Sequence, residues 1–209
     1  MIITMKDIEE LKMHIGGNMK KAIIDIDGVL NHYPQTWLDF LEKEKGLKFE
    51  NLKDVKNTLS YKQYKEYKED YRYSKYKNDA KVRSDAKLLF DLLHNKGYLI
   101  YIITARPLFK YDLLENTILW LQKNGLKYDY IYCSQKKDFT IFEKFGHIDL
   151  VIEDNCDNIE KIRNINGPYN CRYFIVNNKD NMEHGNNLQA FTRIDGLYKV
   201  LEVLANDKN

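Results

Sequence analysis

Short apolar runs alternate with amphipathic stretches along most of this chain. The run Ala22–Ile24 is mostly β-branched and too short for a helix, which predicts a buried strand. Four further runs predict strands at residues 98–103, 130–133, 149–152 and 172–176. Helical periodicity predicts helices at residues 86–93, 108–124, 159–165 and 196–205. Strands alternating with helices predict an α/β fold, a Rossmann-like parallel sheet with helices on both faces.

Polar residues and glycines predict where several of these elements begin and end. Ser84-Asp85 is expected to cap the helix that follows it, and Gly97 to end that helix. Asp138 is expected to cap a short helix that stops near Gly146. Residues 166–168, Asn-Gly-Pro, predict a turn.

The segment from Asn31 to Arg83 interrupts this alternation. A cluster of apolar residues around Trp37 predicts one helix, and a lysine-rich stretch at residues 61–77 predicts another. The second carries tyrosines at three- and four-residue steps, namely Tyr61, Tyr64, Tyr67 and Tyr71. Such a stripe usually packs against a core while the lysines face water. The alternative is that the tyrosines stack on an aromatic ligand and the lysines attract its phosphate.

Composition narrows the class of protein. The 209 residues suffice for one sizeable core, and the net charge of +2 does not favour stable nucleic-acid binding. The three cysteines form no CxxC pair, which favours a reducing compartment and disfavours a disulfide scaffold or a zinc site. No apolar run approaches the length of a membrane span. We therefore expect a cytoplasmic protein in which residues 1–18 form an N-terminal extension.

Polar residues gather where the predicted strands end. Asp25 and Asp27 follow the first strand, on one face of an extended chain, and Gly28 allows a turn directly after them. An Asp-Gly pair is also typical of a simple capped turn. The other strand ends carry Thr104 with Arg106, Lys136 with Lys137, and Glu153 with Asp154. Parallel strands bring their carboxyl ends to one edge, where ligands bind. Carboxylates there can hold Mg²⁺, and a lysine and a hydroxyl suit phosphoryl chemistry.

Four segments, in this order, resemble the four motifs of the haloacid dehalogenase (HAD) superfamily. They are DIDGVL at residues 25–30, ITAR at 103–106, a lysine after the third strand, and IEDN at 152–155. The resemblance spans roughly residues 21–158. Within the superfamily, the Thr-Ala-Arg-Pro and Glu-Asp-Asn stretches are most similar to the 5'(3')-deoxyribonucleotidase-like branch of nucleotidases.

The resemblance implies a role for each strand end. Asp25 would be the nucleophile and Asp27 the general acid and base, and a second aspartate here distinguishes the superfamily's phosphatases from its dehalogenases. Thr104 and a lysine would contact the phosphoryl oxygens; Lys137 is preferred, with Lys136 as the alternative. Arg106 would contact phosphate or pair with an acid. The expected substrate-binding residues are Thr104, Ala105, Arg106 and Lys136.

The same resemblance implies a magnesium site. Mg²⁺ would be held by the Asp25 carboxylate, the Asp27 backbone carbonyl and an acid from the fourth motif. Asp154 is the preferred ligand and Glu153 its neighbour. The chain departs from the usual pattern here, because a glutamate opens the fourth motif where an aspartate is expected.

The domain organisation and function follow as expectations. Residues 34–83 would form a small helical cap inserted after the first strand, and residues 19–33 and 84–209 the α/β core. The expected activity is Mg²⁺-dependent hydrolysis of a small phosphomonoester, a nucleoside 5'- or 3'-monophosphate, through an aspartyl phosphate. The alternatives are a sugar phosphate or a phosphorylated nucleic-acid end as substrate, or a non-catalytic protein that binds Mg²⁺ or phosphate. The oligomeric state is left open.

Overall fold

The computed structural model describes residues 19–106, 110–134, 136–137, 140, 147–166, 170–182 and 191–206. They contain a six-stranded sheet in which every neighbouring pair of strands is parallel. The strands are β1 (Lys20–Ile24), β2 (Tyr98–Thr104), β3 (Tyr130–Cys133), β4 (Leu150–Glu153), β5 (Arg172–Val176) and β6 (Thr192–Ile194). Their spatial order is β3-β2-β1-β4-β5-β6. The predicted α/β class is therefore confirmed.

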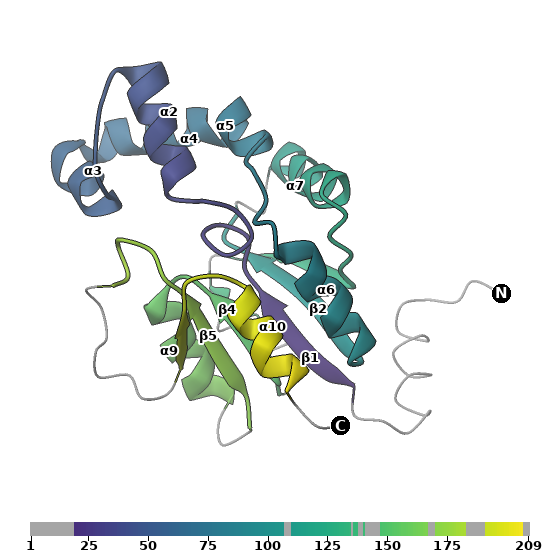
Figure 1. Cartoon of the computed structure of the whole chain (residues 1–209). Coiled ribbons are helices and arrows are strands. Elements are labelled where there is room, and N and C mark those ends of the chain that lie inside the picture. The colour runs from purple at the N-terminus through teal and green to yellow at the C-terminus, as the bar shows by residue number, and fades with distance from the viewer. Residues whose placement is uncertain are drawn as a thin grey trace.

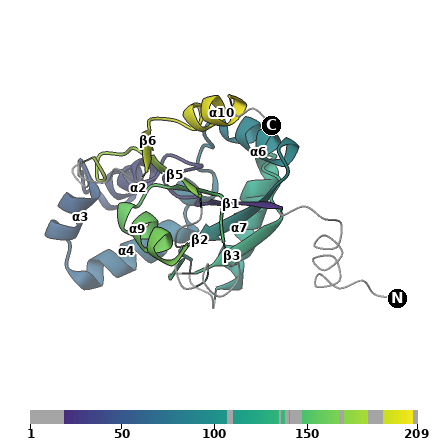
Figure 2. The ribbon, with the colours of Figure 1, turned by 90° about the horizontal axis from the view of Figure 1, so that it is seen from below.

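Helices cover both faces of this sheet (Figures 1 and 2). They are α6 (Ala86–Asn95), α7 (Tyr111–Lys123), α9 (Cys156–Asn166) and α10 (Tyr198–Ala205). Side chains of α6, α7 and α10 pack with Ala22 and Ile24, whereas α9 packs with Ile23 in a second cluster. Alternate residues of β1 thus enter opposite layers of the core, as the two-residue period of a strand requires.

The order of the strands reverses beside β1. Strands β2 and β3 follow β1 on one side, and the chain then crosses to the other side of β1 to form β4, β5 and β6. The carboxyl ends of β1 and β4 therefore flank a topological switch point. In open α/β sheets, ligands bind in the crevice at such a point.

Four helices between β1 and β2 lie beyond the carboxyl end of β1 (Figure 1). They are α2 (Gln35–Lys45), α3 (Leu52–Thr58), α4 (Tyr61–Tyr73) and α5 (Lys75–Asn78), and we call them the cap. The cap encloses an apolar cluster of its own, which includes the buried Trp37, Leu41 and Tyr71. An antiparallel bridge between Asn31 and Val82 closes the insertion at its base. The division of the chain into domains at residues 34 and 83 stays a prediction.

Several local expectations need correction. The helix expected over residues 61–77 is two helices, because the backbone of Ser74 is extended (φ −78°, ψ 158°) and ends α4. Helix α3 and strand β6 were not predicted, since seven and three residues are too few to display a clear period. Asp85 does not cap α6 with its side chain. Its carboxylate instead accepts a hydrogen bond from the backbone N–H of Tyr198, at the start of α10 (2.8 Å).

Some expectations fall outside the described residues. They are the N-terminal extension 1–18, the Asp138 cap with most of the helix expected to follow it, and the greater part of the turn at 166–168. Within the described residues, no helix combines the length and the apolar character needed to cross a membrane.

Candidate active site

The loop after β1 carries the two predicted carboxylates at the edge of the sheet. Asp25 follows the last residue of β1, and its backbone N–H donates to the Ile152 carbonyl of β4 (3.1 Å). The Ile26 carbonyl then accepts from the backbone N–H groups of Leu30 (2.8 Å) and Asn31 (3.3 Å). These bonds close the loop into a tight turn and hold Asp25 against β4.

Gly28 explains why a glycine follows the second aspartate. Its φ of +82° lies in the left-handed region, which side chains with a Cβ rarely adopt. A Cβ on Gly28 would also lie 2.0 Å from Oδ2 of Asp154. The Asp154 carboxylate therefore rests directly on the backbone of the β1 loop, and a glycine leaves room for it.

Lys137 joins the carboxyl ends of β1 and β4. Its ammonium lies 2.8 Å from Oδ2 of Asp25 and forms a second ion pair with Oε1 of Glu153. All three side chains are buried. Lys136 is exposed, and its backbone N–H, rather than its ammonium, contacts Ser134 (3.1 Å). The geometry therefore favours Lys137 over Lys136 as the lysine of this site.

The two acids of β4 have different surroundings. Oε2 of Glu153 accepts the backbone N–H of Asp154 (2.9 Å), and Oε1 accepts the Asn158 amide (2.9 Å) besides the Lys137 ammonium. Among the described residues, the Asp154 carboxylate accepts one hydrogen bond, from the Asn178 amide (3.2 Å). Glu153 is thus occupied with protein donors, whereas Asp154 keeps most of its capacity for another ligand.

Burial and crowding raise the pKa of two carboxyls here. Burial, with a smaller contribution from the charge of Glu153, raises the pKa of Asp25 to about 7. The positive charge of Lys137 acts in the opposite direction but does not cancel this effect. Burial, with Glu153 and Asp25 nearby, also holds the pKa of Asp154 well above its ordinary value. Burial lowers the pKa of Lys137, but its two carboxylate partners raise it above the ordinary lysine value. Full ionisation of the three carboxyls is therefore disfavoured while Lys137 is the one cation among them in the described part of the chain.

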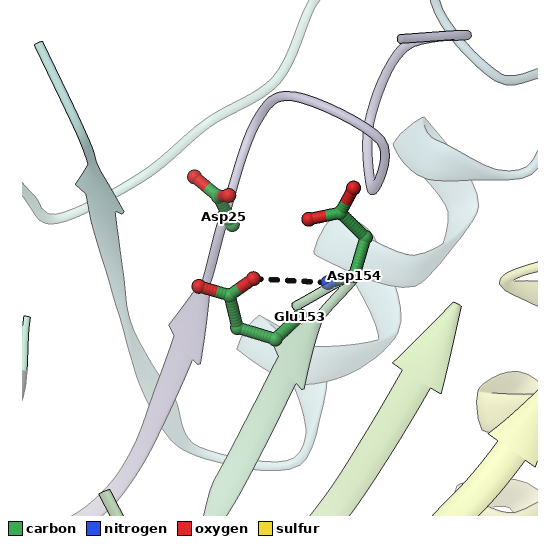
Figure 3. Close-up of side chains that lie close together, drawn as sticks. All are labelled: Asp25, Glu153 and Asp154. Atoms are coloured by element: carbon green, nitrogen blue, oxygen red, sulfur yellow. Dashed lines mark hydrogen bonds between the residues drawn. The ribbon is translucent and has the colours of Figure 1, made fainter. Parts of the chain in front are cut away.

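The acidic cluster fits a divalent cation with oxygen ligands. One carboxylate oxygen from each of Asp25, Glu153 and Asp154 lies within 4.8 Å of the others, and Figure 3 shows the three side chains converging between β1 and β4. Oδ1 of Asp25 is buried and has no hydrogen-bond partner among the described residues. A buried anionic oxygen without a partner is costly, and a hard cation would satisfy it. Asp25 and Asp154 are accordingly the side chains best suited to hold Mg²⁺.

Asp27 has a different environment, built from the cap. Its Oδ1 accepts the Asn31 amide (2.9 Å) and forms an ion pair with the ammonium of Lys77 on α5. Burial disfavours ionisation of Asp27, but Lys77 and Arg106 together hold the pKa of its carboxyl well below the ordinary value. The pKa of Asp25 is thus raised above the ordinary carboxyl value, whereas that of Asp27 is lowered below it.

The end of β2 brings further predicted residues to the same edge. Thr104 is the last residue of β2 and is buried. Its carbonyl accepts the backbone N–H groups of Arg106 and Ser134 (both 2.9 Å), which ties the β2 loop to the β3 loop. Nε of Arg106 is buried without a partner in the described part of the chain, and Ala105 is exposed. Arg106 was expected to contact phosphate or to pair with an acid. No described acid lies within ion-pair distance of it, but its positive charge helps to lower the pKa of Asp27.

A cavity of about 620 Å³ opens beside Asp154, between the cap and the sheet edge. The segment between β1 and α2 lines it with Tyr33, and the cap lines it with Tyr64 from α4 and lysines of α3. The sheet edge lines it with residues that follow β4 and β5. Its lining comprises Tyr33, Asn51, Leu52, Lys53, Lys56, Asn57, Tyr64, Asp154, Asn155, Cys156, Asp157, Asn178, Lys179, Asp180 and Asn181. The cavity therefore meets the acidic cluster at Asp154.

No family model and no curated protein sequence matches the chain. Its structure, however, resembles solved structures. A predicted phosphatase from Clostridium acetobutylicum aligns with a TM-score of 0.61 and 15% identity, over 89% of this chain and all of that one. A HAD phosphatase from Thermococcus onnurineus aligns at 0.53 and 18%, over 91% of this chain and all of that one. The D,D-heptose 1,7-bisphosphate phosphatase of B. bronchiseptica, complexed with magnesium and phosphate, aligns at 0.54 and 12%, with coverages of 91% and 100%.

The chain has the HAD fold. Identities of 12–18% establish the fold and no activity. In this fold the cap lies between β1 and β2. The ends of β1 and β4 and the segment after β3 supply the charged side chains of the cluster. The predicted residues that meet there are Asp25, Lys137, Glu153 and Asp154.

The tyrosine stripe of α4 packs mainly within the cap. Tyr71 is buried in the cap cluster, and Tyr64 and Tyr67 pack against it half-buried, whereas Tyr61 is exposed. The packing interpretation is confirmed for these three residues, although they contact the cap's own cluster rather than the core of the sheet. The expectation that the lysines all face water is wrong at Lys77, which is buried.

Sequence reasoning missed several residues that shape the site. Lys77 lies in a run of similar lysines, so its pattern gives no signal that it is buried. Asn181 donates to the carbonyls of Asp154 and Val176 (both 2.8 Å) and fixes the loop after β4 against β5. Asn31, three residues after Gly28, could have been found from the sequence, because an asparagine close to an Asp-Gly turn often bonds to the turn backbone. Its Oδ1 accepts the Gly28 backbone N–H (3.2 Å), the side-chain-to-backbone bond that Asn makes in turns.

Proposed function

We propose that this protein is a Mg²⁺-dependent phosphatase that hydrolyses a small phosphomonoester, with a nucleoside 5'- or 3'-monophosphate as the preferred substrate. The observation that carries the proposal is the convergence of Asp25, Lys137 and Asp154 at the switch point of the sheet, beside a cavity of about 620 Å³. A nucleophilic carboxylate, a fixed ammonium and a cation site are what phosphoryl transfer to a protein oxygen requires.

Asp25 is the proposed nucleophile. Its carboxylate attacks phosphorus and forms an aspartyl phosphate, while the bond between phosphorus and the leaving oxygen breaks. The Lys137 ammonium lies within contact of Asp25 and faces the charge that builds on the phosphoryl oxygens. Thr104 and Arg106, at the end of β2, are proposed to donate to the same oxygens.

Asp27 is proposed to move the proton. It relays a proton to the leaving oxygen in the first step, and phosphate monoesters, whose second pKa is about 6, bring one when bound as the monoanion. In the second step Asp27 takes a proton from water as the water attacks phosphorus. The bond from phosphorus to Asp25 then breaks and phosphate leaves.

Mg²⁺ would be held by the Asp25 and Asp154 carboxylates and the Asp27 backbone carbonyl, and when bound it supplies charge neutralisation for the phosphoryl oxygens. Glu153 is proposed to orient Lys137 and the start of the β4–α9 loop, with which it hydrogen-bonds. Asp25 and Asp154 would then hold the cation, while Glu153 would position Lys137 and the loop after β4.

The cavity supports a nucleoside as the leaving group. Tyr33 and Tyr64 offer aromatic surface for a base, and Lys56 and Lys179 offer positive charge at its mouth. Five asparagines line the same cavity, and among the described residues the side-chain N–H groups of Asn57 and Asn155 donate no hydrogen bond, so they can donate to base edges and sugar hydroxyls. A sugar phosphate would use the same amides with less of the aromatic surface.

The test is phosphate release by the purified protein with Mg²⁺ from a panel of esters. The panel contains nucleoside 5'- and 3'-monophosphates, sugar phosphates and an end-phosphorylated oligonucleotide. We expect turnover of the mononucleotides, and a loss of at least about 10³-fold in Asp25→Asn, because that change removes the nucleophile. Asp91→Asn, which alters a surface acid of α6 paired with Lys87, serves as the matched control and should leave the rate unchanged.

The alternatives give different results in the same assay. Faster turnover of the sugar phosphates or of the oligonucleotide would show that one of these, and not the nucleotide, is the preferred substrate. The proposed reaction mechanism would stay the same. A protein inert to the whole panel would contradict the proposal. Binding of beryllofluoride at Asp25 in such an inert protein would indicate a role in binding phosphate rather than in hydrolysis.

A further inference from the structure

Lys77 is the buried lysine of the cap that reaches the edge of the sheet. Its side chain is 5% exposed, and its ammonium pairs with Oδ1 of Asp27. The Asn31 amide donates to that same oxygen (2.9 Å). Two donors on one oxygen fix the rotation of the carboxylate. Within the described residues Oδ2 of Asp27 accepts no hydrogen bond, and the side chain remains 32% exposed.

The position of Lys77 is set by the segment that returns to the sheet. The carbonyl of Ala80, three residues later, accepts the indole N–H of Trp120 on α7 (2.8 Å). Val82 then bridges to Asn31. Although α5 belongs to the cap, the residues that follow Lys77 are therefore attached to α7 and to the loop after β1. This arrangement keeps its ammonium at Asp27.

We propose that Lys77 is a positioning residue for the proton transfer by Asp27. This role rests on the proposed phosphatase function. With Asn31, Lys77 holds Oδ1 so that Oδ2 is turned toward the reacting ester. The proton passes from Oδ2 of Asp27 to the leaving oxygen as the bond from that oxygen to phosphorus breaks. Proton transfer needs heavy atoms within about 2.6–3.2 Å, so a carboxylate that is free to rotate transfers the proton less often.

The proposal predicts an effect that depends on the leaving group. A nucleoside leaves as an alkoxide and needs the proton, whereas p-nitrophenol leaves as a stabilised phenolate and does not. In Lys77→Met we expect kcat/KM for a nucleoside monophosphate, which reports the steps up to formation of the aspartyl phosphate, to fall at least about tenfold, a part of the ~10²–10⁴-fold that general acid catalysis supplies. The kcat/KM for p-nitrophenyl phosphate should change less than about threefold, because no contact to the phosphoryl group is removed and p-nitrophenolate leaves without a proton.

Two further variants make the test specific. Lys75→Met alters a lysine of the same helix whose side chain is 73% exposed, and it should match the wild type on both esters. Lys77→Arg keeps a cation at Asp27 and should recover part of the lost kcat/KM on the nucleotide. If Lys77→Met fails to fold by circular dichroism, Lys77→Leu, which also removes the ammonium and leaves an apolar side chain, replaces it with the same expected selectivity.

The outcomes separate this inference from the proposed function. Equal losses of kcat/KM on both esters, or no loss on either, with an active wild type would overturn the role of Lys77 and leave the phosphatase intact. A wild type that is inactive on both esters would overturn the phosphatase and this role together. A loss confined to the nucleotide, with partial recovery in Lys77→Arg, is the result that supports the proposal.

Discussion

At the scale of single residues, the acidic cluster depends on one position without a side chain. Gly28 combines a left-handed backbone with a carboxylate, that of Asp154, on the site where a Cβ would stand. Gly46 at the end of α2 has a similar φ of +69°, but nothing lies within 4 Å of the position that a Cβ would take there. Comparing the same substitution at the two glycines therefore separates the effect of backbone strain from the effect of displacing a carboxylate.

We expect Gly28→Ala to be destabilised more than Gly46→Ala and to bind Mg²⁺ more weakly. Left-handed backbone costs a residue with a Cβ about 1–2 kcal/mol, a cost that both variants share. In Gly28→Ala the new methyl group also pushes Asp154 away from Asp25. Urea denaturation followed by circular dichroism measures the first effect, and isothermal titration with Mg²⁺ the second. Mg²⁺ affinity in Gly28→Ala equal to that of the wild type would contradict the assignment of Asp154 as a ligand.

At the scale of the element, helix α4 carries a second lysine in an unusual environment. Lys68 is half-buried, donates to the Tyr33 hydroxyl (2.9 Å), and lies over the rings of Tyr33 (4.3 Å), Trp37 (4.8 Å) and Tyr71 (5.1 Å). No described carboxylate lies within ion-pair distance of it. Burial lowers the pKa of Lys68 to about 7, with Lys77 acting in the same direction and Asp27 opposing.

This shift predicts how stability changes with pH. Below about pH 7 Lys68 is protonated in both states and contributes no pH dependence. Between about pH 7 and the ordinary lysine pKa of 10.5, the unfolded chain holds a proton that the folded chain has lost, so the free energy of unfolding rises with pH. We expect the wild type to gain stability relative to Lys68→Met between pH 6.5 and pH 9.5.

Urea denaturation at the two pH values measures this difference. Lys62→Met changes an exposed lysine of the same helix and should show the pH dependence of the wild type. A wild type that instead lost stability relative to Lys68→Met as the pH rises would show that Lys68 is charged in the folded cap.

At the scale of the whole molecule, the acidic cluster links the two halves of the sheet. Asp25 comes from β1 and Asp154 follows β4, the strand on the other side of the switch point. Repulsion among buried carboxylates opposes folding, and a cation that binds only the folded chain reverses that effect. Metal binding and the stability of the sheet should therefore be coupled.

We expect Mg²⁺ to raise the melting temperature. At a hundredfold excess over Kd, binding adds about 2.7 kcal/mol, which corresponds to roughly 5–10 °C for a chain of this size. Asp154→Asn should lose this increase and, without Mg²⁺, melt no lower than the wild type, because it removes a carboxyl whose ionisation burial and the neighbouring acids oppose in the folded chain. Thermal melts monitored by circular dichroism measure both. Asp157→Asn, a change to another acid beside the cavity, should keep the full increase; an increase retained in Asp154→Asn would contradict the proposed site.

Five of the six described strands, most helices and the sheet-edge acids could be predicted because each is encoded locally. A buried strand shows itself in a few consecutive residues, as at Ala22–Ile24, and an acid directly after such a run must lie where the strand leaves the core. The order of the motifs then suffices to bring Asp25, Lys137 and Asp154 to one edge, since parallel strands share their carboxyl end. The lengths of α3 and β6 are too short for the same reasoning.

The sequence by itself thus determined the α/β class, five of the six described strands and the identity of the acids at their ends. Only the tertiary structure decided which lysines are buried: Lys77 at Asp27, fifty residues away in the chain, and Lys68 among the cap aromatics. It also decided that Asp85 caps α10 and not its own helix. The physical reason is that a periodic pattern reports the burial of apolar side chains within one element. A charged residue looks the same in sequence whether its partner is water or a carboxylate brought to it by the fold.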